Sequence, residues 1–175
     1  MRIVLLLLAV VVGLALIVVV VGYLLPVKHV ATVSAKIPAT PAMVWATITD
    51  PRAYPSWRGD VTSVEMLTAA GGRVAWREIG KNDAISYAIE QAEAPHRLVT
   101  RIIDKSLPFG GSWEYVVTNE GAGTRVRITE HGDVYNPVFR FVSRFIMGHS
   151  ATASGYLKAL GARYSAQVVP EVEPE

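Results

Sequence analysis

The chain has 175 residues and a formal net charge of only +2, with 51% hydrophobic and 18% charged residues. Its basic residues are dispersed, so it lacks the concentrated positive charge expected of a nucleic-acid-binding protein. It contains no cysteine, which excludes disulfide frameworks, thiolate nucleophiles and cysteine-based zinc sites. The spacing of its histidines and carboxylates indicates neither a metal nor a redox cofactor.

An uncharged N-terminal segment holds much of the hydrophobic content. Residues 3–25 are 23 residues rich in Leu and Val, and about 20 such residues cross a bilayer core as an α-helix. The alternative is a cleaved signal peptide, since Val33, Ser34 and Ala35 resemble a small-residue cleavage site. Signal peptides have apolar parts of only about 7 to 15 residues, however, and cleavage there would remove part of the first predicted strand. The segment therefore predicts a retained transmembrane helix.

The charges on the two sides of this helix bear on its orientation. Arg2 and the N-terminal amine precede it, whereas Lys28 and His29 follow it. Positively charged residues tend to stay on the cytoplasmic side, and the balance slightly favours a cytoplasmic N-terminus. The sequence thus predicts a single-pass membrane protein whose domain lies outside the cytoplasm.

Strand and helix signals follow in a regular order. Alternating apolar residues predict a first strand at residues 30–37. Thr40 and Pro41 suit the N-cap and first position of a helix, and Val44 and Ile48 lie on its apolar side. Six more strands, separated by turn residues, are predicted at 61–67, 73–79, 85–92, 97–103, 112–117 and 125–134.

A long amphipathic helix is predicted near the C-terminus. After Asn136 and Pro137, apolar residues recur at three- and four-residue spacing from Val138 to Tyr164. Such a helix must pack on the sheet, and a long helix over a strongly curved sheet often leaves a hollow between the two. The residues after it, 167–175, are acidic and contain proline, and they predict a disordered tail.

Several motifs resemble a known family. The sequence Pro41-Ala-Met-Val-Trp45, the segment from Thr49 to Trp57 with its Asp-Pro and Tyr-Pro-Ser-Trp, and the closing strand and helix are similar to the START-like superfamily, in its polyketide cyclase/dehydrase and lipid-transport branch. The resemblance covers residues 28–166. It implies an α+β helix-grip fold, in which a curved seven-stranded antiparallel sheet wraps a long C-terminal helix around an apolar cavity. It implies no single activity, because members include lipid carriers, ligand sensors, aromatase/cyclases and chaperone co-factors.

Strand alternation indicates which polar side chains face this cavity. On the last strand Glu130 shares the inner face with Ile128, and on an earlier strand Glu78 shares it with Trp76. His149 lies on the apolar stripe of the predicted helix and should also face the sheet. The predicted ligand-binding side chains are mostly aromatic, with these three polar groups among them: Trp57, Trp76, Glu78, Tyr87, Trp113, Tyr115, Glu130, Phe141, Phe145 and His149.

An inward-facing Glu130 needs a partner, because an isolated buried carboxylate is energetically expensive. His149 is one candidate, an Arg, Tyr or Trp donor is another, and Glu78 could share a proton with it. Three roles stay open: a structural tie between helix and sheet, a site for a ligand head group, or proton-transfer catalysis by Glu130 or His149. The other histidines are scattered and are predicted at the surface or in turns: His29, His96 and His131.

These observations favour a membrane-anchored protein that binds a hydrophobic small molecule, such as a lipid, an isoprenoid or a polyketide-like compound, between sheet and helix. Its partners are then this molecule and the membrane. One alternative is an enzyme of the cyclase/dehydrase kind, with Glu130 and His149 in proton transfer, although no nucleophile with its base is visible. Another is a non-catalytic protein with a filled core and a groove for a protein partner.

Overall fold

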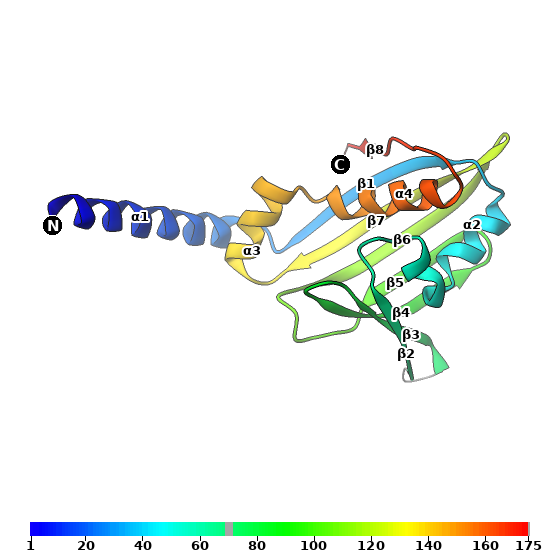
Figure 1. Cartoon of the computed structure of the whole chain (residues 1–175), viewed down its shortest axis with the longest axis horizontal. Helices are drawn as coiled ribbons and strands as arrows, with labels where there is room; N and C mark the ends of the chain where they lie inside the picture. Colours follow the sequence, from blue (N-terminus) through cyan, green and yellow to red (C-terminus); the bar gives the residue numbers. More distant parts are fainter. Residues whose placement is uncertain (69–71, 175) are drawn as a thin grey trace.

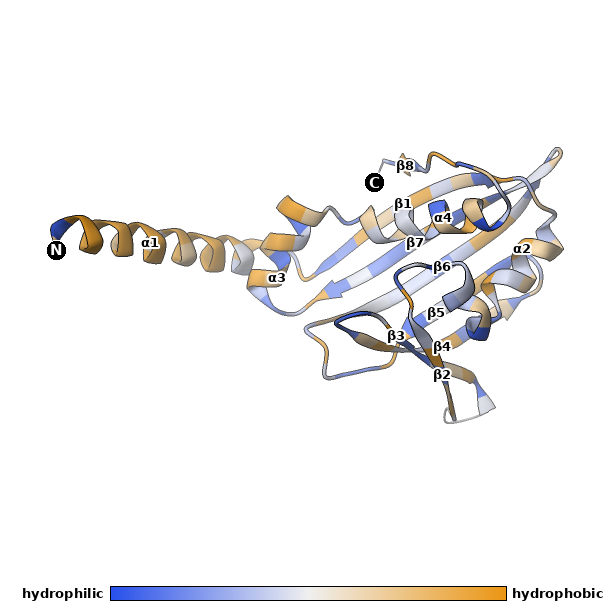
Figure 2. Cartoon of the chain, viewed as in Figure 1, coloured by the Kyte–Doolittle hydropathy of each residue, from blue (hydrophilic) through white to orange (hydrophobic). Residues whose placement is uncertain are grey.

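The computed structural model describes residues 1–68 and 72–174. The N-terminal helix α1 (Arg2–Leu24) projects away from an α+β domain (Figure 1). It exposes its apolar side chains along almost its whole length, and Figure 2 shows it as a continuous hydrophobic rod. A helix of this length and composition has the properties of a membrane span or of a signal sequence.

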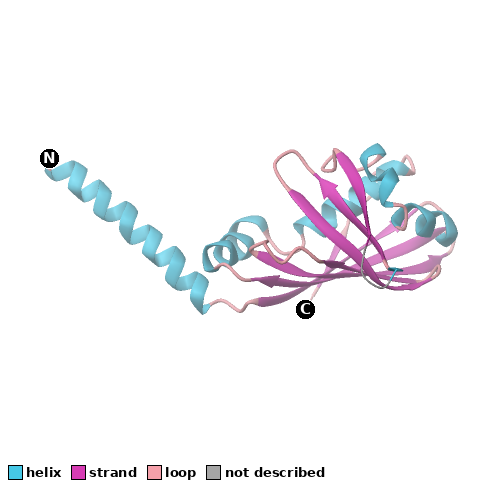
Figure 3. Ribbon diagram, turned by 90° about the horizontal axis from the view of Figure 1, so that it is seen from below, coloured by secondary structure: helices cyan, strands magenta, loops and turns pink. Residues whose placement is uncertain are grey.

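One antiparallel sheet forms the body of the domain. Among the described residues it has eight strands in the order β2-β3-β4-β5-β6-β7-β1-β8. The strands are β1 (Lys28–Ile37), β2 (Ser63–Thr68), β3 (Val74–Ile79), β4 (Ala84–Glu93), β5 (Arg97–Ile102), β6 (Phe109–Glu120), β7 (Gly123–Val134) and β8 (Glu171–Glu173). The first seven match the predicted strands, so the α+β antiparallel architecture is confirmed. The helices of the domain lie on one side of the sheet (Figure 3).

Two short helices follow β1 and lie at the end of the domain opposite α1 (Figure 1): α2 (Pro41–Ile48) and the 3-10 helix η1 (Pro51–Ser56). The predicted start of α2 is confirmed. The side-chain oxygen of Thr40 accepts a hydrogen bond from the Met43 amide at 3.3 Å, and Pro41 occupies the first helical turn, where its missing N–H costs nothing.

The C-terminal helix is broken, contrary to the prediction of one continuous helix from Val138 to Tyr164. It consists of α3 (Pro137–Val142), the π-helical turn η3 (Ser143–Met147) and α4 (Ala151–Arg163). Gly148 separates the last two with a φ of 77°, a conformation that favours glycine and ends a helix. As a result α4 packs on β1 and β7, whereas α3 lies mainly against α1.

The main core lies between α4 and the sheet, close to α2. Leu157 and Leu160 of α4 have no exposed surface, because they point at the inner faces of the strands. The rest of this core is mostly aliphatic and comes from β1, α2, β5, β6, β7 and α4: Val33, Ala35, Ile37, Val44, Ile48, Leu98, Val117, Val126, Ile128 and Ala153.

The C-terminal tail is ordered where the sequence predicted disorder over 167–175. Its strand β8 pairs with β1. Arg125 and Arg127 of β7 reach across β1 to Glu171 and Glu173, at 3.1 and 2.8 Å. The acidic composition that suggested a solvated tail therefore provides partners for basic residues two strands away. Residue 175 lies outside the described residues.

The end of α1 is held against α3. Arg140 donates hydrogen bonds to the carbonyl oxygens of Gly22 and Leu25, at 3.1 and 3.0 Å, and so caps a helix end whose carbonyls lack intrahelical partners. Gly22 is buried, and a Cβ atom there would lie 2.0 Å from the carbonyl oxygen of Pro137. Glycine therefore permits the close approach of the two helices.

The burial of α4 provides a test of the core. Leu157→Ala should lower the free energy of unfolding by about 2–5 kcal/mol, because it leaves a cavity that the surroundings fill only partly. The adjacent Lys158 is exposed, so Lys158→Ala should change the free energy of unfolding by less than about 0.5 kcal/mol. Denaturant unfolding of the full-length protein in detergent, followed by circular dichroism, compares the two. Equal effects would contradict the packing of α4 on the sheet.

Candidate functional site

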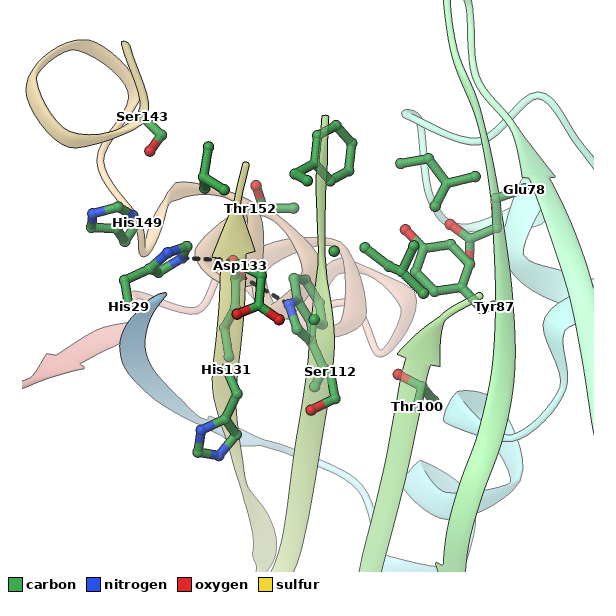
Figure 4. A pocket seen from close by; sticks show the side chains of 18 of the residues that line it. His29, Glu78, Tyr87, Thr100, Ser112, His131, Asp133, Ser143, His149 and Thr152 are labelled. Carbon is green, nitrogen blue, oxygen red and sulfur yellow. Dashed lines mark hydrogen bonds and ion pairs between the residues drawn. The ribbon is translucent and has the colours of Figure 1, made fainter. Parts of the chain in front are cut away.

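A cavity of about 370 Å³ lies between the sheet and the C-terminal helices. Its volume is within the range of small-molecule sites, roughly 300–1,000 Å³. The lining is mainly aromatic and aliphatic, with carboxylates and histidines at its ends, and includes His29, Tyr54, Arg58, Trp76, Glu78, Ile85, Tyr87, Ile102, Phe109, Trp113, Tyr115, Glu130, Phe139, Met147, His149 and Thr152. In Figure 4, His29 and His149 lie together on one side and Glu78 and Tyr87 on the other.

One end of the cavity is organised around Glu130 of β7. Trp113, its cross-strand neighbour on β6, donates its indole N–H to Glu130 Oε2 at 2.9 Å. His29 Nε2 lies 3.2 Å from Glu130 Oε1, and the dashed lines in Figure 4 mark both interactions. The carboxylate is thus held by one neutral donor and one imidazole, as a buried acidic group requires.

The place of His29 depends on the glycine opposite it. Gly132 of β7 pairs with His29 of β1, and a Cβ atom on Gly132 would lie 2.2 Å from His29 Cε1. The missing side chain leaves room for the imidazole to lie flat over the sheet. His149 then stacks on it, with ring centroids 3.8 Å apart and 24° between the planes.

The structure corrects the prediction for His29. Its side chain is only 12% exposed and faces the cavity, whereas the sequence placed it at the surface. The alternation of β1 contains the signal, because His29 shares a face with Ala31 and Val33. Of the predicted partners for Glu130, the tryptophan donor is present as Trp113. His149 does face the cavity, from the loop before α4 rather than from a helix.

The opposite end of the cavity is organised around Glu78 of β3. Trp76 donates its indole N–H to Glu78 Oε1 at 2.9 Å, and Arg58 forms an ion pair with Glu78 at 3.0 Å. Arg58 also pairs with Asp60 at 2.6 Å. Glu78 therefore has its own partners here. Sequence reasoning missed Arg58, because it lies in a loop after η1 where no periodicity marks its direction.

Aromatic rings hold Arg58 in place. Its guanidinium carbon lies 5.1 Å from the ring centroid of Tyr54 and 5.2 Å from that of Tyr156, within the range of cation–π attraction. Only 11% of the Arg58 side chain is exposed. A buried cation between two rings and two carboxylates forms a rigid end wall for the cavity.

Burial controls ionisation at the Glu78 end. It raises the pKa of Glu78, and the nearby Arg58 cation and the Trp76 hydrogen bond offset this only in part. Burial alone would lower the pKa of Arg58, but its hydrogen bond to Asp60 and the charge of Glu78 outweigh that effect and raise it. Burial likewise raises the pKa of Tyr115 well above its ordinary value. The phenol therefore stays neutral.

Most of the predicted aromatic residues lie on the cavity wall. Trp76 stacks on Tyr87 at 5.6 Å between centroids, and Trp113 and Tyr115 both contact Tyr156 of α4. These contacts make a continuous apolar surface between the two carboxylates. Inward strand alternation, with its period of two, is sufficient to find the strand residues among them.

Three predicted ligand-binding residues lie elsewhere. Trp57 packs edge-to-face on Tyr54 and Tyr156, behind the cavity wall. Phe141 and Phe145 contact each other at 5.0 Å on α3 and η3, and Phe145 is 59% exposed. The break at Gly148 changes the direction of the chain, and these two rings are not among the residues that line the cavity. Within residues 1–68 and 72–174, no three His, Asp or Glu side chains gather closely enough to hold a metal ion.

The raised pKa of Glu78 predicts a pH-dependent stability. The folded chain holds this proton to a higher pH than the unfolded chain, in which the pKa is about 4.5. Its contribution to stability is therefore fully present below that pH and is lost as the pH rises through the folded-state pKa. Thermal melts of the full-length wild type and of Glu78→Gln should therefore be compared at several pH values. The wild-type midpoint minus the variant midpoint should fall as the pH rises from the unfolded-state pKa to the folded-state pKa of Glu78.

Glu65→Gln is the matched control for the pH experiment, because Glu65 is an exposed carboxylate on the neighbouring strand β2. It removes the same charge without touching the buried cluster. A midpoint difference that rises with pH in Glu78→Gln, or the same downward trend in both variants, would contradict the assignment.

A family model described as polyketide cyclase / dehydrase and lipid transport matches residues 28–162, from the start of β1 almost to the end of α4. No curated protein sequence matches the chain significantly. The match therefore includes every residue that lines the cavity.

Solved structures share the fold at low sequence identity. A START superfamily protein from Mycobacterium smegmatis has a TM-score of 0.63 at 15% identity, covering 78% of this chain and 97% of that one. TTHA0849 from Thermus thermophilus has the same TM-score and coverages, 78% and 97%, at 21% identity. The Zhui aromatase/cyclase from Streptomyces sp. R1128 has a TM-score of 0.62 at 12% identity, covering 79% and 94%. The chain belongs to the polyketide cyclase/dehydrase and lipid-transport family and has a START-like fold.

Proposed function

We propose that the protein binds a hydrophobic small molecule, such as a lipid, an isoprenoid or a polyketide-like compound, in the cavity between the sheet and α4. The observation that carries the proposal is the cavity of about 370 Å³ itself, with aromatic walls and a hydrogen-bonded carboxylate at each end. A mostly apolar pocket with a few convergent polar groups is how small-molecule sites are generally built.

The polar groups restrict the chemistry of the ligand. Glu130 keeps 20% of its side chain exposed although it already has two partners. A carboxylate accepts hydrogen bonds, so a hydroxyl or phenol on the ligand suits this end, whereas a ligand carboxylate would be repelled. At the other end Glu78 is engaged by Arg58 and Trp76. The best ligand is therefore apolar along its length with a hydroxyl at the Glu130 end.

The position of α1 supports a role at a membrane. The cavity wall begins at His29, only a few residues after α1 ends at Leu24. Phe139 and Met147, also on the wall, belong to the segment that packs beside α1. With α1 as a membrane anchor, this end of the cavity lies near the bilayer surface, where an apolar ligand exchanges without crossing bulk water. The side of the membrane stays a prediction.

Ligand occupancy tests this function. Native mass spectrometry of the full-length protein in detergent, with organic extraction of the same sample, should reveal a bound apolar species at about one per chain. Thr152 of α4 lines the cavity, so Thr152→Trp should fill it and lower occupancy by about tenfold or more. Ala151→Trp is the control, because Ala151 is the neighbouring exposed residue of α4 and lies outside the lining.

Two results would contradict the binding function. One is a wild-type protein that carries no apolar molecule and takes none from vesicles. The other is equal occupancy in Thr152→Trp and the wild type, which would place the bound molecule elsewhere. An empty cavity together with a co-purifying protein would favour the partner-binding alternative instead.

The pairing of Glu130 with His29 also supports a second candidate, an enzyme of the cyclase/dehydrase kind. A carboxylate and an imidazole 3.2 Å apart in a cavity wall are suited to proton transfer. Glu130→Gln keeps the shape of the side chain but accepts no proton. It should then slow turnover by about 100-fold or more for each molecule of bound compound, with the occupancy measured in the same mass spectra. Unchanged turnover would exclude this role.

A further inference from the structure

A second pocket, of about 210 Å³, lies where α1 meets the domain. Its walls come from the link after α1, the first residues of β1 and the α3–η3 segment. Leu25 and Pro26 lie at its α1 side, and Lys28, Arg140 and Arg144 contribute its charges. It adjoins the apolar cavity, and the two share the wall formed by His29, Val134, Ser143 and His149.

The lining of this pocket is positively charged, although Asp133 of β7 lies opposite Lys28 in the sheet. Its lining contains three cationic side chains, Lys28, Arg140 and Arg144, and no Asp or Glu. In the part of the chain that the structure describes, none of the three forms an ion pair. Arg58 and Arg125, by contrast, each pair with two carboxylates. Three like charges around one concave surface repel one another and raise the local concentration of anions.

Arg140 provides an independent sign of a missing acceptor. Its two terminal nitrogens donate to backbone carbonyl oxygens of Gly22, Leu25 and Tyr135. Its Nε atom is buried and has no hydrogen-bond partner among the described residues. Buried donors are nearly always satisfied, so the guanidinium of Arg140 has one unused hydrogen-bond donor beside a pocket that this residue lines.

Apolar surface lies directly beside these charges. Phe145, Ile146 and Met147 of η3 follow Arg144 in the chain and are 59%, 71% and 55% exposed. Figure 2 shows this segment next to the hydrophobic end of α1. Basic side chains with neighbouring exposed aromatic and aliphatic ones are typical of protein surfaces that contact anionic membranes.

We infer that the basic pocket at the α1–domain junction binds a phosphate group, supplied by the head group of an anionic phospholipid or by free phosphate. Lys28 and Arg144 hold the anion as charged donors, and the guanidinium of Arg140 adds a third positive charge beside it. The acyl chains of a phospholipid lie along η3 and α1. The phospholipid source rests on the proposed membrane anchorage, whereas the phosphate chemistry of the pocket does not.

The test uses the full-length protein in a neutral maltoside detergent. Native mass spectrometry measures the binding of dioleoylphosphatidylglycerol and dioleoylphosphatidylcholine, each with and without millimolar inorganic phosphate. The double variant Lys28→Gln/Arg144→Gln removes two of the pocket charges and spares the hydrogen bonds of Arg140. The matched control Lys158→Gln/Arg163→Gln removes two exposed charges from α4, and neither residue lines the pocket.

Phosphatidylglycerol should bind more tightly than phosphatidylcholine, and the pocket variant should weaken it by about tenfold while the control changes it less than about twofold. Binding that inorganic phosphate does not displace assigns the site to a phospholipid. Displacement by phosphate, with the same dependence on Lys28 and Arg144, assigns it to the free anion. Equal weakening in both double variants, or no preference for phosphatidylglycerol, would overturn the inference.

A third variant separates this inference from the proposed function. Thr152→Trp fills the apolar cavity and should leave phosphatidylglycerol binding within about twofold, because Thr152 does not line the basic pocket. An empty apolar cavity with intact phosphatidylglycerol binding would reject the proposed function alone. Loss of both ligands in Thr152→Trp would show one shared site and so reject a separate phosphate pocket.

Discussion

The incomplete cover of the sheet by α4 is the constraint on which the rest of the domain depends. Leu157 and Leu160 fill the space above the strands at the α2 end, where the sheet contributes small aliphatic residues. Tyr156, packed on Trp113 and Tyr115, forms the boundary of that core. Beyond it the helix ends and Gly148 turns the chain away. The inner face of the sheet continues beyond α4, and the cavity lies between it and the α3–η3 segment, which contributes Phe139 and Met147 to the lining.

A carboxylate lies at each end of the cavity, and the two have the same kind of hydrogen-bond partners. Each carboxylate accepts a hydrogen bond from an indole N–H at 2.9 Å, Trp76 for Glu78 and Trp113 for Glu130. Each also has one nitrogen-containing side chain as a second partner, Arg58 for Glu78 and His29 for Glu130. An indole supplies a donor without adding charge, while its ring extends the apolar wall. The two carboxylates can therefore stay inside the cavity with hydrogen-bond donors and without a change in its apolar character.

Periodicity explains which parts of this site the sequence predicted. The inward direction of Glu78 and Glu130 follows from strand alternation, which any half-buried strand obeys. His29 was missed because the first strand was predicted to begin at residue 30, two residues late. The apolar spacing typical of a helix continues through Gly148, because a hydrophobic pattern contains no information on the φ angle that ends the helix there. For that reason Phe145 was predicted to face the cavity, which it does not line. The pairing of β8 depends on contacts distant in the chain, which local composition does not encode.

The joint between α1 and the domain has a mechanical consequence. The close approach of Gly22 to Pro137 and the two hydrogen bonds from Arg140 leave little freedom between the helix and the sheet. In the proposed membrane-anchored arrangement, α1 and the domain therefore tilt together as one rigid body. A transmembrane helix adjusts its tilt to the thickness of the bilayer. A thinner membrane would swing the whole sheet towards the lipid surface, and bilayer thickness would thereby determine how close the cavity lies to its supply of ligand.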